Sequence, residues 1–154
     1  MWTIEEGTEK IRSKGLKITS QRVGILKVLK GRKDHPSAEQ VFREMKKDHP
    51  TISFATIYST AQILEDAGLL QILTIDGHRV FFDPNPEPHA HYRCRKCGHV
   101  FDIPLPSGTL KKITEASGEI VESIQVYCYG TCSACISRER EKDREPVGNS
   151  KNWQ

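Results

Sequence analysis

Several features that mark other classes of protein are missing from this sequence. It has no apolar run long enough to cross a bilayer and no cleavable signal at its N-terminus, which predicts a cytoplasmic protein without a membrane partner. It has no H-E-x-x-H motif and no serine, histidine and aspartate set, which argues against a zinc-dependent hydrolase. We therefore expect no enzymatic activity. No internal repeat is found.

A large excess of one charge is also missing, since the formal net charge is only +3. Residues 10–33 nevertheless contain nine lysines and arginines and no acidic residue. Such a run is typical of a surface that faces phosphates or of a solvated helix face, and the run alone does not separate the two. At 154 residues the chain can form one ordinary domain or two small ones, and each small one would be marginally stable without a structural metal.

Four helices are predicted in the first 70 residues from apolar periodicity and capping residues. The first helix is expected over residues 4–13, with a stop near Gly15, and the second is expected to start at Thr19 or Ser20. The third is expected to start at Ser37 and stop at His49-Pro50, and the fourth to start at Ser53 and stop at Gly68. The third helix is expected to bury Ala38, Val41, Phe42 and Met45.

A β-hairpin is predicted directly after these helices. Residues 69–75 and 78–83 are rich in β-forming residues, and Asp76-Gly77 between them favours a type I′ turn. Four helices followed by a hairpin are the element order of a winged helix, whose fourth helix would enter the major groove of DNA. The expected fold class is therefore α+β, with a winged helix-turn-helix domain over residues 1–83.

A second, small α/β domain is predicted over residues 89–136. The segment 84–88 has three prolines and is interpreted as a hinge. Beyond it we expect two strands around the first Cys-x-x-Cys, a helix over residues 109–116 and one long strand over residues 119–130. Residues 137–154 are interpreted as a charged, flexible tail that begins as a helix.

Five cysteines include two Cys-x-x-Cys pairs, at Cys94 and Cys97 and at Cys132 and Cys135. Two such pairs predict a structural zinc site with four thiolates and no open coordination position. The alternative, a dithiol redox module, expects one pair in a βαβ context rather than two pairs after a helix-turn-helix. Cys128 lies outside the pattern and is interpreted as a core thiol.

A second group of possible ligands surrounds this site. His89 and His91 are two residues apart, so on a strand both side chains leave the same face and can reach one ion. Asp83 and Asp102 could add carboxylates. From these residues alone, a second metal site and a pair of unconnected histidines are both open.

The chain resembles the ferric-uptake-regulator family of bacterial metal-responsive repressors from about residue 10 to residue 136. The motifs that carry the resemblance are ITSQR (18–22), HPSAEQVF (35–42), SFATIYSTAQILEDAGL (53–69), HAHYRCRKCG (89–98) and the late Cys-x-x-Cys. The resemblance implies a homodimer, joined through its C-terminal sheet, that binds double-stranded DNA at a near-palindromic operator.

The resemblance also implies a regulatory metal site made by His35, Asp83, His89, His91 and Asp102. Three imidazoles and two carboxylates suit Fe(II) or Mn(II). Aspartate at position 102 resembles the peroxide-sensing branch, in which iron-bound protein would be oxidised at His35 or His89 and would release DNA. An iron, manganese or zinc sensor without peroxide sensing is the alternative. A third site of some relatives is not expected, because Gln125 replaces the histidine it needs.

DNA contacts are expected from two regions. Basic residues before and within the second helix would bind phosphates, and the exposed face of the fourth helix would contact bases, with Tyr58 near thymine methyl groups and Gln62 near adenine. The complete set is Lys14, Lys17, Arg22, Ser53, Ala55, Thr56, Tyr58, Ser59 and Gln62. Relatives often carry arginine or asparagine after the tyrosine, whereas Ser59 follows it here, so the operator sequence is not predicted.

Overall fold

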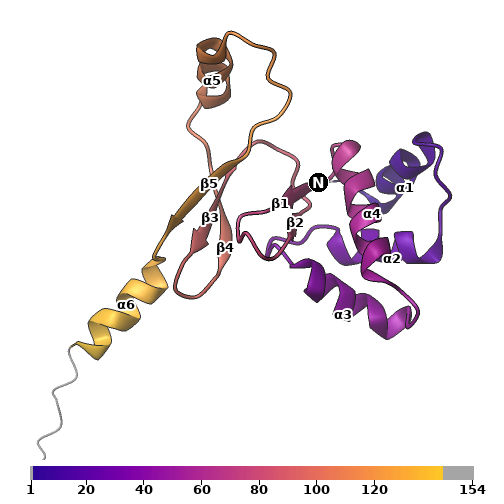
Figure 1. Cartoon of the computed structure of the whole chain (residues 1–154), viewed down its shortest axis with the longest axis horizontal. Helices are drawn as coiled ribbons and strands as arrows, with labels where there is room; N and C mark the ends of the chain where they lie inside the picture. The colour runs from indigo at the N-terminus through magenta and orange to yellow at the C-terminus, as the bar shows by residue number, and fades with distance from the viewer. Residues whose placement is uncertain (1, 144–154) are drawn as a thin grey trace, which may run out of the picture.

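The protein is described by a computed structural model that covers residues 2–143. Helices α1 to α4 form one part of the molecule, a three-stranded sheet forms the other, and a two-stranded hairpin lies between them (Figure 1). Helix α5 and helix α6 project from opposite ends of the sheet (Figure 1). None of the helices in residues 2–143 is long and apolar enough to cross a bilayer.

The four N-terminal helices confirm the predicted order. Their bounds are α1 Ile4–Ser13, α2 Ser20–Leu29, α3 Ala38–Asp48 and α4 Phe54–Asp66. The side chains of Thr19, Ser37 and Ser53 each accept a backbone hydrogen bond from the first turn of the helix that follows, which fixes where α2, α3 and α4 begin. Gly68, with φ of 71°, follows the end of α4 as predicted.

The core of the helical part is built from apolar residues on the inner faces of all four helices. Ile11, Ile25, Val41 and Leu64 are fully buried there. Phe42 is only partly buried, contrary to the prediction, because its ring stacks on the exposed ring of Phe54 at the edge of this core.

The hairpin consists of β1 Gln71–Leu73 and β2 Phe81–Asp83, which pair antiparallel. The predicted type I′ turn is wrong, because that turn needs positive φ at both central residues and Asp76 does not have it. Instead, Gly77 N–H donates to Thr74 C=O at 3.1 Å, and residues 74–80 form a longer loop. The carboxylate of Asp76 holds this loop through ion pairs with Arg79 and Arg93.

The C-terminal part contains a three-stranded sheet of order β4-β3-β5. Its elements are β3 Ala90–Cys94, β4 Val100–Ile103, α5 Thr109–Ser117, β5 Val126–Gly130 and α6 Ser133–Lys142. β3 pairs antiparallel with β4 and parallel with β5. Residues 137–142 therefore belong to α6, and the rest of the predicted tail, from residue 144, lies outside the described residues.

The predicted strand over residues 119–130 is wrong in its first half. Ala90, the first residue of β3, pairs with Val126, so the residues before Val126 would have to pair with the proline-rich segment 84–88. Proline has no N–H to donate to a sheet, and the strand therefore starts only at Val126. Cys128 on this strand is half-buried rather than a core thiol.

Backbone hydrogen bonds tie the helical part to the hairpin. Phe82 N–H donates to Pro36 C=O and Ala38 N–H donates to Val80 C=O, both at 2.9 Å, so the loop before α3 lies against β2. On the other side of the hairpin, the Tyr129 hydroxyl donates to Ile75 C=O at 3.1 Å. The hairpin thus connects α3 to the C-terminal sheet.

Candidate metal centres

The four cysteines of the two Cys-x-x-Cys pairs converge at the end of β3 and the start of α6. Their sulfur atoms all lie within 4.8 Å of one another, with Cys94 Sγ 3.9 Å from Cys135 Sγ and Cys97 Sγ 3.8 Å from Cys132 Sγ. A disulfide needs about 2.0 Å. A tetrahedron with zinc–sulfur bonds of about 2.3 Å has edges of about 3.8 Å, so the spacing fits a four-thiolate zinc site.

The electrostatics of this cluster also favour a cation. Hydrogen bonds from the backbone N–H groups of Cys132 and Cys97 lower the pKa of Cys94 to about 5, so this sulfur is a thiolate at neutral pH. Burial and the neighbouring thiols raise the pKa of Cys135 to about 12. The Cys94 thiolate therefore disfavours ionisation of Cys135 unless a cation such as zinc balances the charge. Cys132 is the N-cap residue of α6 and Cys135 lies in its first turn, where the helix dipole favours negative charge.

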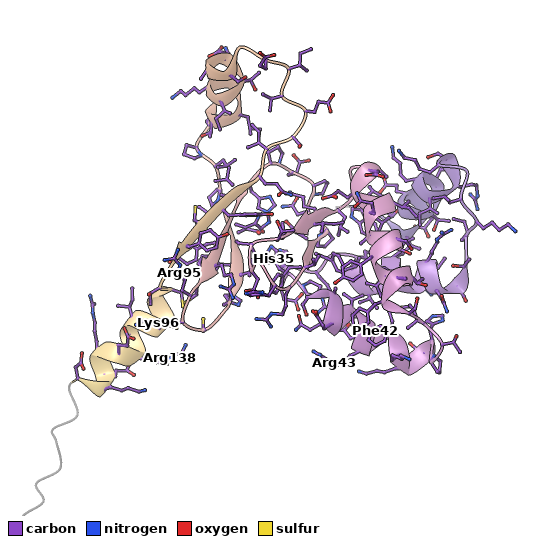
Figure 2. The ribbon with its side chains drawn as sticks, viewed as in Figure 1. His35, Phe42, Arg43, Arg95, Lys96 and Arg138 are labelled. Atoms are coloured by element: carbon purple, nitrogen blue, oxygen red, sulfur yellow. The ribbon has the colours of Figure 1, made fainter. Side chains whose placement is uncertain are left out.

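The second cluster lies between the helical part and the C-terminal sheet, where Figure 2 labels His35. One ligand atom from each of five residues lies within 4.8 Å of all the others, and the residues are His35, Asp83, His89, His91 and Asp102. His35 precedes α3, Asp83 ends β2, His91 lies on β3 and Asp102 faces it across the strand pair on β4. The structure thus brings together all five residues of the predicted regulatory site.

Of the three imidazoles in the cluster, only His91 forms a hydrogen bond with a carboxylate of the cluster, from Nε2 to Asp83 Oδ2. His35 Nε2 lies 2.7 Å from Asp102 Oδ1, and His89 Nε2 lies 2.8 Å from Asp83 Oδ2. Both Nε2 atoms are buried and neither makes a hydrogen bond of acceptable angle. Buried nitrogen atoms close to carboxylates yet not aimed at them are expected where all point at a cation.

Hydrogen bonds outside the cluster orient two of its ligands. His89 Nδ1 lies 2.6 Å from the carbonyl oxygen of Glu87, which can only accept, so Nδ1 carries the proton and Nε2 is left to bind a metal. Burial disfavours ionised Asp83, but hydrogen bonds with His91 and from Asn85 N–H outweigh this and lower the pKa of Asp83. Asp83 is therefore an anionic ligand at neutral pH.

The backbone at His35 is unusual. Its φ of 47° makes it the one non-glycine residue with positive φ in residues 2–143. This conformation is costly for a residue before proline. The flanking hydrogen bonds of Pro36 and Ala38 to β2 hold it in place, as is common at functional sites.

Comparison with known proteins decides the family. The sequence profile of the ferric uptake regulator family matches residues 13–129. The chain belongs to the ferric uptake regulator family. The peroxide-responsive repressor PerR of Staphylococcus aureus is 31% identical over 134 residues, which are 86% of this chain and 90% of that protein.

Two solved structures of related proteins are similar to this chain. The iron-containing ferric uptake regulator of Francisella tularensis has a TM-score of 0.64 and 31% identity, covering 79% of this chain and 96% of that one. PerR of Streptococcus pyogenes, described as a peroxide sensor, has a TM-score of 0.50 and 28% identity, covering 88% and 94%. The predicted fold class is confirmed by these likenesses.

Four of the residues expected to contact DNA lie together on the surface of the helical part. Lys17, Arg22, Thr56 and Ser59 line one surface hollow of about 500 Å³ between the start of α2 and the face of α4. Lys14, Ser53, Ala55 and Tyr58 are also exposed. Gln62 is exposed as well, but its amide donates to Glu65 and Asp66, a contact it would have to exchange for a base.

Sequence reasoning missed Phe54, the first residue of α4, which is 39% exposed between Phe42 and Tyr58. Its apolar character within the fourth-helix pattern was the only available signal. Gln125 donates to Ile72 C=O and accepts from the Tyr127 hydroxyl. It thereby joins β1 to the segment before β5.

Proposed function

We propose that this protein is a homodimeric repressor that binds a near-palindromic operator in double-stranded DNA when Fe(II) or Mn(II) occupies its histidine and aspartate site. The observation that supports this proposal is that the five ligands come from different parts of the chain. His35 comes from the loop before α3, Asp83 from β2, and His89, His91 and Asp102 from the C-terminal sheet region. A single ion can bind all five ligands only in the arrangement that brings the loop before α3, β2 and the C-terminal sheet together.

This geometry supports a simple form of allostery. We divide the chain into a DNA-binding part (residues 1–83), a hinge (84–88), a dimerisation and metal-binding part (89–136) and a tail (137–154). A metal that needs both parts binds the closed arrangement more tightly and shifts the population toward it, with a preference of about 10⁴-fold needed to go from 1:99 to 99:1. Zinc at the four cysteines would instead be permanent and structural. Because the target is DNA, we place the repressor in the cytoplasm.

The first test is DNA binding as a function of metal. Wild-type protein with Mn(II) is expected to select and bind a duplex from a random pool, and chelation of the regulatory metal is expected to release it. Lys17→Ala should weaken binding to all duplexes and lower the slope of log affinity against log salt by about 1, because one phosphate contact is lost. Metal-independent binding by the wild type would contradict the proposal.

Peroxide sensing is the finer part of the proposal, and it is supported by the two PerR relatives. Bound Fe(II) would supply the electrons that start cleavage of peroxide, whereas Mn(II) would not. Overall, hydrogen peroxide would oxidise one imidazole carbon by two electrons. One of its oxygen atoms would be added to the ring, and the other would be released as water. The family resemblance names His35 and His89 as the oxidised residues, and their Nε2 atoms lie 2.7 and 3.1 Å from Oδ1 of the half-exposed Asp102.

Peroxide treatment of iron-loaded protein is expected to release DNA and add the mass of one oxygen atom to the peptide that holds His35 or the one that holds His89. The manganese-loaded protein is the control and should keep both its mass and its DNA. Release of DNA without an adduct would favour the alternative, an iron, manganese or zinc sensor that responds only to metal supply. Metal titrations in the DNA-binding assay would then identify which ion it senses.

A further inference from the structure

An aromatic stack at the start of α4 has no part in the function described so far. The ring of Phe54 stacks on that of Phe42 from α3, with centroids 4.0 Å apart and ring planes 15° apart. The ring of Tyr58 is also near Phe54, with centroids 6.4 Å apart. Figure 2 labels Phe42 on α3, on the side of the molecule away from the C-terminal sheet.

Phe54 contributes little to the packed interior. Its side chain is 39% exposed, and it belongs to neither of the two apolar clusters, whereas Phe42 packs against the larger one. Phe42 is therefore held in place by the core, and the ring of Phe54 stacks on it with its remaining surface exposed to solvent. A ring held by stacking loses little conformational freedom when it binds a partner.

The surroundings of the exposed ring suit nucleic acid. The ammonium group of Lys46 lies 5.2 Å from the centre of the Phe42 ring, so a cation flanks the stack. Thr56 and Ser59, on the same helix, open into the hollow that also holds Lys17 and Arg22. An apolar ring in a stack flanked by one cation, on a helix that also lines a basic hollow, is complementary to an apolar group bordered by phosphates, and in the major groove that group is the thymine 5-methyl.

We propose that Phe54 is a specificity-determining residue that contacts a thymine 5-methyl group in the major groove, held in position by Phe42. The proposal rests on the DNA-binding function proposed above. It predicts that Phe54 recognises a methyl group rather than a hydrogen-bonding pattern, so the contact distinguishes thymine from uracil. Tyr58, one helical turn later, would contact a separate position.

The test measures whether the loss of affinity on removing one thymine methyl group depends on the side chain at position 54. Wild type and Phe54→Ala, both loaded with Mn(II), are titrated with the selected operator and with duplexes in which single thymines are replaced by deoxyuridine. Wild type should lose roughly fourfold in affinity when one thymine is replaced at a single position of either half-site, the value for removing one buried carbon group. Phe54→Ala should bind the thymine and deoxyuridine forms of that position equally. Phe54→Leu, which keeps an apolar side chain, should retain part of the discrimination.

Thr8→Ala on α1 is the control, because Thr8 belongs neither to the aromatic stack nor to the hollow that holds Lys17 and Arg22. It should keep the discrimination of the wild type. Thermal melting and metal stoichiometry check that Phe54→Ala is folded. The proposal is overturned if Phe54→Ala keeps the discrimination at every position or if wild type is indifferent to every methyl. Failure of the parent proposal would look different, since wild type would then not bind the thymine operator in a metal-dependent manner.

Discussion

Replacing Cys97 with serine is expected to remove zinc from the protein and to unfold the C-terminal sheet. Structural zinc in small domains contributes about 10–16 kcal/mol of apparent binding free energy, and this is also folding free energy. The sheet has few other means of support, since its fully buried apolar side chains are few and the first turn of α6 is made by Cys132 and Cys135. Metal analysis, far-ultraviolet circular dichroism and thermal melting of the variant would measure the effect.

Cys128→Ser is the matched control for this experiment. Cys128 is a half-buried cysteine on β5 that lies outside the four-sulfur cluster. The control should retain one zinc per chain and melt close to the wild type. If Cys97→Ser also kept one zinc and melted normally, the four-thiolate assignment would be wrong.

His91→Ala should abolish regulation while leaving the fold intact. Its ring is 1% exposed, its Nε2 lies 3.0 Å from Asp83 Oδ2, and it faces Asp102 across the β3 and β4 pair. Loss of a partner that only orients a ligand costs 10–100-fold in metal affinity, so loss of the ligand itself should cost more than about 100-fold. Titration with Mn(II) should show weakened binding, and DNA binding should disappear at metal concentrations that saturate the wild type.

His99→Ala provides the comparison, since His99 is an exposed histidine between the two metal clusters and is a member of neither. It should bind Mn(II) and DNA as the wild type does. Zinc content should be unchanged in both histidine variants. Normal Mn(II) affinity in His91→Ala would refute the five-ligand site, and lost zinc in that variant would mean that the effect was structural.

The two clusters lie on one strand and have different connections to the rest of the chain. Cys94 ends β3 and is joined to α6 through the four sulfurs, whereas His91, three residues earlier, is joined to β2 and to the loop before α3. Zinc therefore connects elements within the C-terminal part, and the regulatory metal connects that part to the helices. In the proposed function, this separation would let one metal stabilise the fold while the other acts as a switch.

The sequence alone determined those features that depend on neighbouring residues. Thr19, Ser37 and Ser53 fixed the starts of three helices, because a capping side chain satisfies backbone N–H groups only three residues away. The two Cys-x-x-Cys pairs predicted a four-sulfur cluster for a similar reason, since each short turn brings its own two sulfurs together. Periodicity was less reliable at the edge of the core, where Phe42 turned out to be half of an exposed stack.

Tertiary structure decided what depends on distant residues. The sequence near a strand does not show which other strand it can pair with, so the strand that ends at Gly130 was predicted too long. In the hairpin, a longer loop replaces the predicted tight turn, and Asp76 forms ion pairs there with Arg79 and the distant Arg93. Local spacing predicted only that His89 and His91 could bind one ion, and His35 was predicted as a ligand from the family resemblance. Only the packing of β2 against the loop before α3 brings His35 to within 2.7 Å of Asp102, because contacts between residues so far apart in sequence are set by the folded chain as a whole.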